Sequence, residues 1–323
     1  MKLKELLEPI GEELDLFDEH MREAMRSKVA FVDMVARYIV RQKGKRIRPA
    51  LVLLTAKACG EINDRTYRGA SLVEILHTAT LIHDDVVDDA DTRRGLASIN
   101  AVWKNKIAVL MGDYMLAKGL LLSIGSNDFD FLKITSDAVR RMSEAEILQI
   151  AKSRDLDLDE QTYFRIISDK TASLISTCCQ IGAASVSNDA QTLESMRVFG
   201  ENLGLVFQIR DDLLDYVGRT SITGKPTGLD LKEKKLTLPL IHSLAEAPRS
   251  EGRHILHIIK NGAKRKDVQA VVEFAHSYGG ITYTIGRAEH YSKLAADALD
   301  ILPSSPAKEA LTGFVQFVME RSK

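Results

Sequence analysis

The sequence predicts an all-α protein. Apolar residues recur at helical spacing through almost all of its 323 residues. Nowhere do apolar and polar residues alternate in a run flanked by hairpin turn residues, as they do in half-buried strands. Residues that commonly end helices, among them Gly60, Gly125 and Pro303, fall between the periodic segments. These three observations favour a helical bundle.

The periodic segments place the helices in order along the chain. Those at 64–88, 106–125, 158–187 and 190–218 are apolar around much of their circumference, which is typical of helices surrounded by other helices. We therefore expect them at the centre of the bundle. The one long irregular stretch, 218–234, is either a lid that closes over a site or a plain surface loop. The expected helices are 2–26, 28–42, 49–60, 64–88, 106–125, 127–152, 158–187, 190–218, 235–246, 250–261, 265–278, 280–302 and 305–322.

Length, composition and charge narrow the class of protein. The length fits one large domain or two small ones, and no segment resembles a linker, so we expect one domain over 1–323. A formal net charge of -1 gives no reason to expect nucleic acid as a partner. The N-terminus lacks the apolar core of a signal peptide, and no apolar run approaches the roughly 20 residues that span a bilayer. We expect a cytoplasmic protein without a transmembrane segment.

The three cysteines have no spacing that suggests chemistry. Cys59 stands alone and Cys178 is adjacent to Cys179, which fits neither a metal site nor a redox motif. Thiols in a reducing compartment are usually small buried hydrophobes. We assign all three to packing.

Two aspartate pentads stand inside apolar helical stretches, where carboxylates are costly to place. The first, at 84–88, reads DDVVD, and the second, at 211–215, reads DDLLD. On a helix that turns by about 100° per residue, the first and last aspartates of a pentad share one face, one turn apart. Each helix therefore presents a set of carboxylates to one ligand.

Carboxylate sets of this kind suit a hard divalent cation. Mg2+ takes carboxylate oxygens, keeps several waters and fills its remaining positions with phosphate oxygens, so two facing sets suit a metal-bound diphosphate. One pentad alone also fits a solvated helix end. A calcium loop is set aside because neither pentad has the central glycine and terminal glutamate of an EF-hand. The candidate metal ligands are Asp84, Asp85, Asp88, Asp211, Asp212 and Asp215.

Cationic residues lie beside the acidic pentads. The stretch 43–49 carries Lys45 and Arg48 before a helix, and Arg93 and Arg94 follow the first pentad. An arginine fork grips phosphate through two hydrogen bonds, and a trianionic ligand next to six carboxylates needs such cations. A solvated surface cluster is the alternative for the first stretch taken alone.

Polar residues also interrupt apolar helix faces near the pentads. His77 lies two helical turns before the first pentad, and Gln208 lies three residues before the second. Lys170 and Thr171 form a donor pair within an apolar helix. A histidine at such a place also fits a satisfied core residue. Taken together, these groups indicate polar side chains that face a cavity.

In order and number, these motifs resemble those of the trans-isoprenyl diphosphate synthase family. The resemblance implies a single all-α domain of the isoprenoid synthase type, a helical bundle with a deep central cavity, usually a homodimer. It implies head-to-tail condensation of isopentenyl diphosphate onto an allylic diphosphate such as farnesyl diphosphate, with three Mg2+ ions per active site. The matching segments, which span most of the chain, are GKRIRP at 44–49, 77–88, RRG at 93–95, KTA at 170–172, FQIRDDLLD at 207–215, and 224–239.

The same resemblance assigns roles to individual residues. It implies that the six pentad aspartates hold Mg2+ on the diphosphate. It implies that Thr171 and Gln208 line the reacting carbons and direct oxygen dipoles at an allylic cation, so that they and Lys170 are the candidate catalytic residues. Contacts to the allylic diphosphate are implied for Arg93, Lys170, Lys225 and Lys235. Contacts to isopentenyl diphosphate are implied for Lys45, Arg48, His77 and Arg94.

The helix that runs back from the first pentad indicates the product length. Short-chain members of the family place a bulky aromatic floor where this chain has Ala79 and Thr80. We therefore expect a channel that is open past these layers, with Leu76 met next. One helical turn of about 5.4 Å is close to the length of one isoprene unit. The expected product is a medium- or long-chain all-trans polyprenyl diphosphate, as in octaprenyl-type synthases.

Several other functions fit part of the pattern. A class I terpene cyclase also uses DDxxD with Mg2+, but its second metal motif does not match 211–215, and the basic motifs also disfavour a head-to-head synthase. A short-chain geranylgeranyl or farnesyl diphosphate synthase stays open. So does a non-catalytic subunit of a heteromeric synthase, although such subunits tend to lose pentad aspartates. A long apolar product suggests peripheral contact with a membrane, although no sequence feature identifies an anchor.

Overall fold

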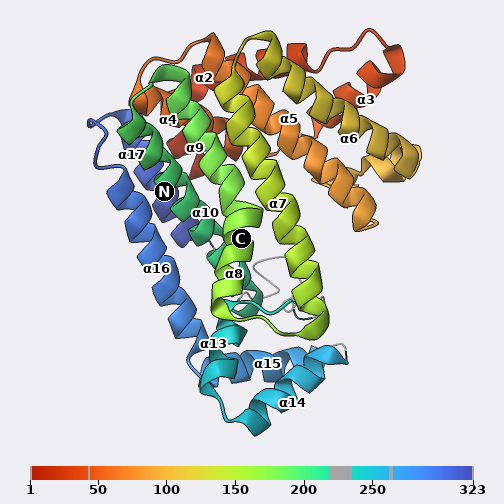
Figure 1. Ribbon diagram of the computed structural model, residues 1–323, viewed down its shortest axis with the longest axis vertical. Helices are drawn as coiled ribbons and strands as arrows, with labels where there is room; N and C mark the ends of the chain where they lie inside the picture. Colours follow the sequence, from red (N-terminus) through yellow and green to blue (C-terminus); the bar gives the residue numbers. More distant parts are fainter. Residues whose placement is uncertain (1, 43, 218–230, 232–234, 262–264, 322–323) are drawn as a thin grey trace.

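Long helices make up most of the described chain, as the hydrophobic periodicity predicts (Figure 1). The computed structural model describes residues 2–42, 44–217, 231, 235–261 and 265–321. Within these ranges the all-α class is confirmed. The expected loop at 218–234, with Lys225, lies outside the described residues apart from Leu231.

The elements follow one another in an order close to that expected. They are α1 (Leu3–Leu7), η1 (Glu8–Ile10), α2 (Gly11–Ala24), α3 (Ala30–Arg41), α4 (Ile47–Cys59), α5 (Asp64–Val87), β1 (Thr92–Arg93), β2 (Leu96–Ala97), α6 (Ile99–Gly125), α7 (Phe129–Asp155), α8 (Glu160–Ile167), η2 (Ser168–Ala172), α9 (Ser173–Val186), α10 (Ala190–Val217), α13 (Leu238–Glu246), α14 (Arg249–Lys260), α15 (Arg265–Ser277), α16 (Gly280–Ala298) and α17 (Pro306–Met319).

Three of the expected helices differ in detail. The first is interrupted by the 3-10 turn η1, where Pro9 removes a backbone donor. Helix α6 begins at Ile99 rather than at 106, and it has a kink at Lys104, where φ is 70°. The segment expected as one helix over 158–187 contains a π-helical turn, η2, between α8 and α9. That turn carries two of the candidate catalytic residues.

A short β-hairpin follows the first pentad, although the sequence predicted no strand there. Strands β1 and β2 pair antiparallel, with Arg93 opposite Leu96. Arg94 and Gly95 form the two-residue turn, and their φ angles of 52° and 79° are the positive values that a type I′ turn requires. Strands of two residues are too short to produce an alternating pattern. The hairpin holds Arg93 and Arg94 close to the end of α5.

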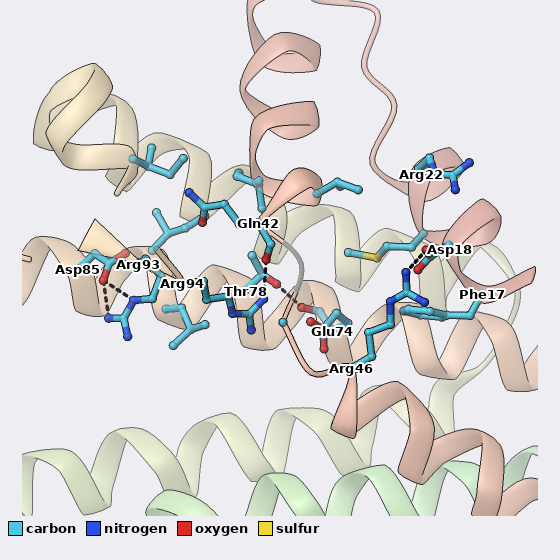
Figure 2. Close-up of a pocket in the computed structure, with 17 residues that line it drawn as sticks. Phe17, Asp18, Arg22, Gln42, Arg46, Glu74, Thr78, Asp85, Arg93 and Arg94 are labelled. Atoms are coloured by element: carbon cyan, nitrogen blue, oxygen red, sulfur yellow. Dashed lines mark hydrogen bonds and ion pairs between the residues drawn. The ribbon is translucent and has the colours of Figure 1, made fainter. Parts of the chain in front are cut away.

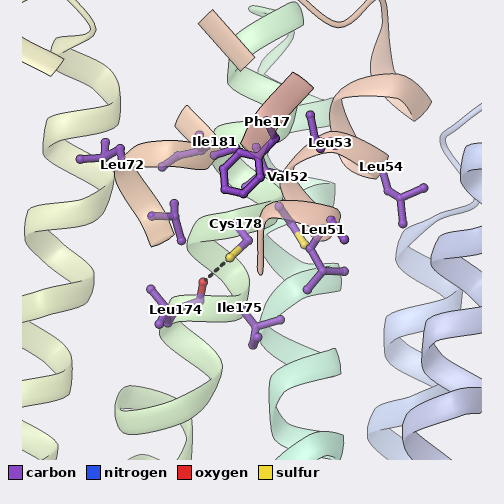
Figure 3. Packing of buried hydrophobic residues seen from close by; sticks show 14 of the residues in the cluster. Phe17, Leu51, Val52, Leu53, Leu54, Leu72, Leu174, Ile175, Cys178 and Ile181 are labelled. Atoms are coloured by element: carbon purple, nitrogen blue, oxygen red, sulfur yellow. Dashed lines mark hydrogen bonds between the residues drawn. The ribbon is translucent and has the colours of Figure 1, made fainter. Parts of the chain in front are cut away.

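The centre of the bundle is an apolar core around α4, α5 and α9 (Figure 3). Helix α9 approaches α4 closely because Gly182 has no side chain: a Cβ there would lie 2.4 Å from the carbonyl oxygen of Val52. Cys178 and Cys179 are free thiols buried in this core, in agreement with the packing role expected of them.

Helix α10 connects this core to a second apolar cluster. Leu203 and Val206 of α10 belong to the central core, whereas Leu205 and Ile209 belong to a cluster with α8 and α13–α16. In Figure 1, α13, α14 and α15 lie at the lower end of the view, away from α4 and α5. A helix buried on opposite faces is rigid along its length, so α10 is a firm support for the second pentad.

Helix α6 differs from the expectation that no apolar run approaches the length needed to span a bilayer. By length and composition alone, Ile99–Gly125 is apolar enough to cross a membrane, and 33% of its apolar window is buried inside the protein. It packs along α5. Its exposed apolar side chains include Leu110 and Leu121. The apolar face therefore needs an explanation other than the core of this chain.

The close contact between α9 and α4 yields a stability prediction. Gly182→Ala should destabilise the protein by about 1–3 kcal/mol, because the new methyl group forces two backbones apart. Gly286→Ala on α16 is the matched control, since a Cβ there meets nothing within 4 Å. It should be neutral or stabilising by up to about 1 kcal/mol. Urea unfolding measures both, and equal stabilities would contradict this close packing of the two helices.

Candidate active site

The first pentad forms the C-terminal end of α5. The helix starts with a strong cap, in which the Asn63 side chain accepts hydrogen bonds from the backbone amides of Arg65 and Thr66. It ends at Val87, and Asp88 occupies the C-cap position. The last turn contains no basic residue. Carboxylates at this end face the negative pole of the helix macrodipole, so the pentad is placed where only a cation compensates it.

The second pentad occupies the same place on α10. This helix ends at Val217, two residues after the pentad, and its last turn also lacks basic residues. Two clusters of carboxylates at the C-terminal ends of two central helices are unfavourable for folding. The arrangement points to a function that needs concentrated negative charge.

Within each pentad, the second aspartate differs from the other two. Asp85 and Asp212 are buried, at 3% and 5% exposure, whereas Asp84, Asp88 and Asp211 are exposed. The sequence treats the three aspartates of a pentad as equivalent, and the structure separates them. A buried carboxylate needs partners inside the protein.

Asp85 finds its partner in the hairpin. Arg93 donates from Nε to Oδ1 of Asp85 at 2.8 Å, and its Nη2 bonds the same oxygen (Figure 2). The side-chain amide of Asn100 donates to the backbone carbonyl of Asp85 at 3.2 Å. The hairpin and the end of α5 are thus held together by a charge-assisted hydrogen bond. The predicted contact between Asp85 and a metal stays a prediction.

Asp212 is held in a similar way by neutral donors. The hydroxyl of Tyr163 donates to its Oδ2 at 2.7 Å, and Nε2 of Gln208 donates to its Oδ1 at 2.7 Å. The hydroxyl of Thr171 in turn donates to Oε1 of Gln208 at 2.8 Å. These residues line a cavity of about 110 Å³ together with Lys170 and Lys235. Three predicted catalytic residues and one predicted phosphate contact therefore meet at the second pentad.

Lys170 connects this cavity with the first pentad. Its Nζ donates to Oε1 of Gln149 at 2.7 Å and forms an ion pair with Glu146, both on α7. Although Asp84 is exposed, partial desolvation of its carboxyl raises the pKa of Asp84, and the nearby carboxylates of Asp88 and Glu146 raise it further. Lys170 and Arg93 act on the same carboxyl in the opposite direction. The carboxylates around Asp84 are short of positive charge, which is the condition that a bound cation relieves.

The donor set fits a divalent cation that brings other ligands with it. Among the described residues, no group of three or more His, Cys, Asp or Glu side chains is close enough to hold a metal by itself. Mg2+ is usually held by one or two carboxylates plus phosphate oxygens and waters. Asp84, Asp88 and the first and last aspartates of the second pentad are of the right chemical type.

Arg48 of the 44–49 motif and Arg94 of the hairpin lie near Glu74 on α5. Burial lowers the pKa of Arg48, and the Glu74 carboxylate opposes this effect. In the described part of the chain, Nε of Arg48 has no hydrogen-bond partner. Arg94 donates from Nη1 to the carbonyl oxygen of Gln42 at 3.0 Å. A Cβ at Gly44 would lie 2.7 Å from Cζ of Arg94, so a larger residue there would displace the guanidinium from this position.

Glu74, Gly44 and Arg94 line a cavity of about 80 Å³ that also reaches Asp85 and Arg93 (Figure 2). His77 is close enough to this group for the three arginines to affect its titration. Burial, followed by the charges of Arg48, Arg94 and Arg93, lowers the pKa of His77 to about 2. The imidazole is therefore neutral at physiological pH. Arg48 and Arg94 lie near His77, and an anion is the ligand that this excess of positive charge favours. Their predicted contacts to isopentenyl diphosphate stay a prediction.

Lys45 points to a different space. It lines an apolar cavity of about 200 Å³ with Phe207, Phe317 and Arg321. Nη1 of Arg321 lies 3.5 Å from Oδ1 of Asp211 in the second pentad. Of the predicted contacts to isopentenyl diphosphate, Lys45 is thus the one that faces α17 rather than the Glu74 cluster.

The predicted chain-length residues are divided between a narrow cavity and the core. Leu76 and Thr80 line a narrow cavity of about 10 Å³ whose opposite wall includes Ala138 and Met142 of α7. Ala79 is fully buried in the apolar core and does not line that cavity. Thr80 and Leu76 therefore have the better geometry for a limit on product length.

Sequence reasoning missed several residues of the site. Glu146 and Gln149 share a face of α7 at a spacing of three residues, and both contact Lys170. Tyr163 is buried beside Asp212, and Glu74 is half-buried beside Arg48 and Arg94. The only signal in the sequence was the polar spacing on α7, because the contacts join residues far apart in the chain. Lys225 lies outside the described residues.

Comparisons with known proteins agree on one family. A family model described as polyprenyl synthetase matches residues 29–275. The chain is 34% identical to the octaprenyl diphosphate synthase of Escherichia coli K12 over 323 residues, 100% of each protein. A decaprenyl diphosphate synthase structure from Rhodobacter capsulatus superposes with a TM-score of 0.92 at 33% identity, covering 100% of both chains. A Caulobacter crescentus polyprenyl synthase, complexed with calcium and isoprenyl diphosphate, gives 0.88 at 33% identity, covering 100% of this chain and 98% of that one.

The shifted pKa of His77 predicts how stability depends on pH. The folded protein keeps His77 neutral down to a pKa of about 2, whereas the unfolded chain takes up a proton near 6.5. The contribution of His77 to the free energy of unfolding is fully present above pH 6.5. It is lost as pH falls below that value, by up to about 1.4 kcal/mol per pH unit. The free energy of unfolding of the His77→Gln variant, measured with urea, should therefore depend less on pH between 5 and 8 than that of the wild type.

The control for that experiment is His254→Gln, at an exposed position of α14. It makes the same chemical change away from the arginine cluster. If both variants follow the wild-type pH profile, His77 is not held neutral by burial beside the three arginines.

Proposed function

Because this chain belongs to the polyprenyl synthetase family, we propose that it condenses isopentenyl diphosphate head-to-tail onto an allylic diphosphate and makes a medium- or long-chain all-trans polyprenyl diphosphate. The observation that carries the proposal is the pair of aspartate pentads at the C-terminal ends of α5 and α10, with Lys170 between them. The names of the relatives support the product class.

The proposed cofactor is Mg2+, with three ions per active site. Asp84, Asp88, Asp211 and Asp215 would hold it, with Asp85 and Asp212 behind them in contact with the protein. Bound Mg2+ would supply neutralisation of the pyrophosphate leaving group. The calcium in the Caulobacter crescentus relative supports a divalent cation in this family.

Cationic side chains share the work of holding the two diphosphates. We assign Arg93, Lys170, Lys225 and Lys235 to the allylic diphosphate. Arg93 is oriented for this by Asp85, and Lys170 by Gln149. Lys45, Arg48, Arg94 and the neutral His77 are assigned to isopentenyl diphosphate. Glu74 balances part of the positive charge when that ligand is absent.

The polar chain at Asp212 orients oxygen dipoles. The Thr171 hydroxyl donates a hydrogen bond to Gln208, and the Gln208 amide donates one to Asp212. The lone pairs of the Thr171 oxygen therefore remain available as acceptors. An oxygen fixed in this orientation stabilises a developing allylic cation without rearranging during the reaction.

Condensation proceeds by ionisation, carbon–carbon bond formation and proton loss. The C1–O bond of the allylic substrate breaks, and its electron pair leaves with pyrophosphate. The double bond of isopentenyl diphosphate forms the new C–C bond to C1. The carbon next to the resulting cation loses a proton to the departed pyrophosphate, which restores a double bond and an allylic diphosphate one isoprene unit longer.

A product assay tests this proposal. Incubated with farnesyl diphosphate, isopentenyl diphosphate and Mg2+, the protein should release pyrophosphate and form a polyprenyl diphosphate detectable by mass spectrometry. Pyrophosphate release without isopentenyl diphosphate would indicate a cyclase. A product of 20 carbons would indicate a short-chain synthase, as would a product of 15 carbons when geranyl diphosphate replaces farnesyl diphosphate. No release with either primer and isopentenyl diphosphate would indicate a non-catalytic subunit.

The channel between α5 and α7 predicts opposite effects on product length. Thr80→Tyr should shorten the product by filling the narrow cavity one turn before the first pentad, whereas Leu76→Ala should lengthen it by removing a wall. Mass spectrometry of the products measures both. If the two variants shift the product in the same direction, or not at all, this channel does not hold the growing chain.

We also propose a homodimer formed through the exposed face of α6. On an ideal helix, Val109, Leu110, Leu120, Leu121 and Ile124 fall within an arc of about 120°, and all five are exposed. Ile147 of α7, 69% exposed, adds to the apolar surface of neighbouring elements. A second copy is favoured over a membrane because α6 is already packed along α5 in the bundle. Apolar surface of this extent usually marks an interface.

Solution mass tests the dimer. Leu121→Glu should convert the dimer to a monomer in sedimentation experiments, whereas Ile285→Glu on α16 should leave it intact, because Ile285 is exposed outside the α6 face. A wild-type protein that sediments as a monomer would contradict the proposal.

For localisation we propose the cytoplasm, with reversible contact to a membrane that receives the greasy product. Cell fractionation should find the protein in the soluble fraction or removable from membranes by high salt. Retention in membranes after that wash would contradict it and would favour insertion of α6.

A further inference from the structure

We propose that Arg141 of α7 and Glu201 of α10 are positioning residues that fix the π-turn η2, and thereby set the placement of Lys170 and Thr171. The catalytic meaning of this role rests on the proposed function. Neither residue lines the cavity at the second pentad. Both act through the side chains of Ser168 and Asp169, the first two residues of the turn.

Arg141 binds the first half of the turn from two sides. Its Nε donates to Oδ1 of Asp169 at 2.6 Å, and its Nη2 donates to Oγ of Ser168 at 3.0 Å and to Oε1 of Glu201 at 2.8 Å. The Ser168 hydroxyl donates to the same Glu201 oxygen. Arg165 of α8 adds a weaker pairing with Asp169 at 3.9 Å. One guanidinium thus ties α7, η2 and α10 together.

The second half of the turn is fixed by different contacts. Thr171 donates to Gln208, the hydrogen bond that also connects the turn to Asp212. Ala172 packs directly on α10, where a Cβ at Gly204 would lie 2.4 Å from the Ala172 Cα. Lys170 is therefore the middle residue of a turn that is held on both sides.

A π-turn needs such support. Its hydrogen bonds are poorer than those of an α-helix, and single π-turns often occur at functional sites. Without external contacts, the α8–η2–α9 segment would favour a continuous α-helix. That change would rotate Lys170 away from Gln149 and Glu146, and Thr171 away from Gln208.

The charges of the network favour this role over simple stabilisation. Arg141, Asp169 and Glu201 have side-chain exposures of 23%, 21% and 15%. Burial lowers the pKa of Arg141, but the hydrogen bonds of Glu201 and Asp169 raise it above its ordinary value. Apolar side chains of similar volume would stabilise such a place as well, but would not fix a direction. A bridging guanidinium specifies one arrangement of the turn.

The experiment compares Arg141→Met with Arg140→Met. Arg140 is the neighbouring residue, is exposed, and pairs with Asp137 and Glu144 of its own helix. Without substrates, backbone amides at 168–172 should exchange hydrogen about tenfold faster in Arg141→Met than in wild type. They should exchange at the wild-type rate in Arg140→Met. Equal exchange rates in the two variants would contradict the proposal that Arg141 anchors the turn.

Kinetics then test the catalytic consequence. Arg141→Met should lower kcat about tenfold, with a much smaller change in Arg140→Met. The double variant Arg141→Met/Lys170→Ala should lose less activity than the product of the two single losses, because part of the effect of Arg141 passes through Lys170. An additive loss would show that Arg141 acts only on overall stability and would overturn the positioning role.

A replacement variant and a wild-type product assay complete the experiment. Should Arg141→Met fail to fold, Glu201→Gln replaces it, because it keeps the side-chain shape and weakens the ion pair. Faster exchange at 168–172 is again expected, and an unchanged rate counts against the anchor. A wild-type protein that makes no polyprenyl product would overturn the proposed function, while the exchange rates would still decide whether the anchor exists.

Discussion

Concentrated negative charge at the ends of two helices is the constraint on which the rest of this structure depends. Both pentads stand where the helix macrodipole is already negative, and neither helix has a basic residue in its last turn. The free energy that this placement costs must be recovered from cations and from the surrounding fold. The hairpin after α5 and the polar chain at Asp212 are parts of that surrounding support.

Both pentads reduce the cost of their concentrated negative charge in the same way. The second aspartate turns inward and is bound by protein donors: Arg93 for Asp85, and Tyr163 with Gln208 for Asp212. Burying one carboxylate with good partners fixes the rotation of the helix end. The first aspartate of each pentad is then held toward the solvent side in a defined direction. This division of roles depends on three-dimensional partners and has no counterpart in the spacing of the motif.

Helix positions were predictable because their signal is local: the spacing of apolar residues predicts α5 and α10. The pentads are a local signal as well, and the metal-bound diphosphate that they indicate stays a prediction for this chain. The hairpin at Arg94 and Gly95 was missed because its strands are too short for a pattern. The π-turn was missed because Arg141 reaches it from 27 or more residues away, and the same guanidinium reaches Glu201 at a separation of 60. Ala79 was given a role in the channel that its neighbour Thr80 fits better, since a helix periodicity alone does not show which face a partner helix covers.

The channel walls of α5 lie on the same helix as the first pentad, and this has an evolutionary consequence. Distances along a helix are fixed, so a wall residue keeps its separation from the reaction centre whatever happens in the loops. Under the proposed function, a single exchange of side-chain size at Leu76 or Thr80 would change how many units a lineage adds to its lipid, while the chemistry stays untouched. Lipids of new length would then be reached by small genetic steps, without redesign of the catalyst.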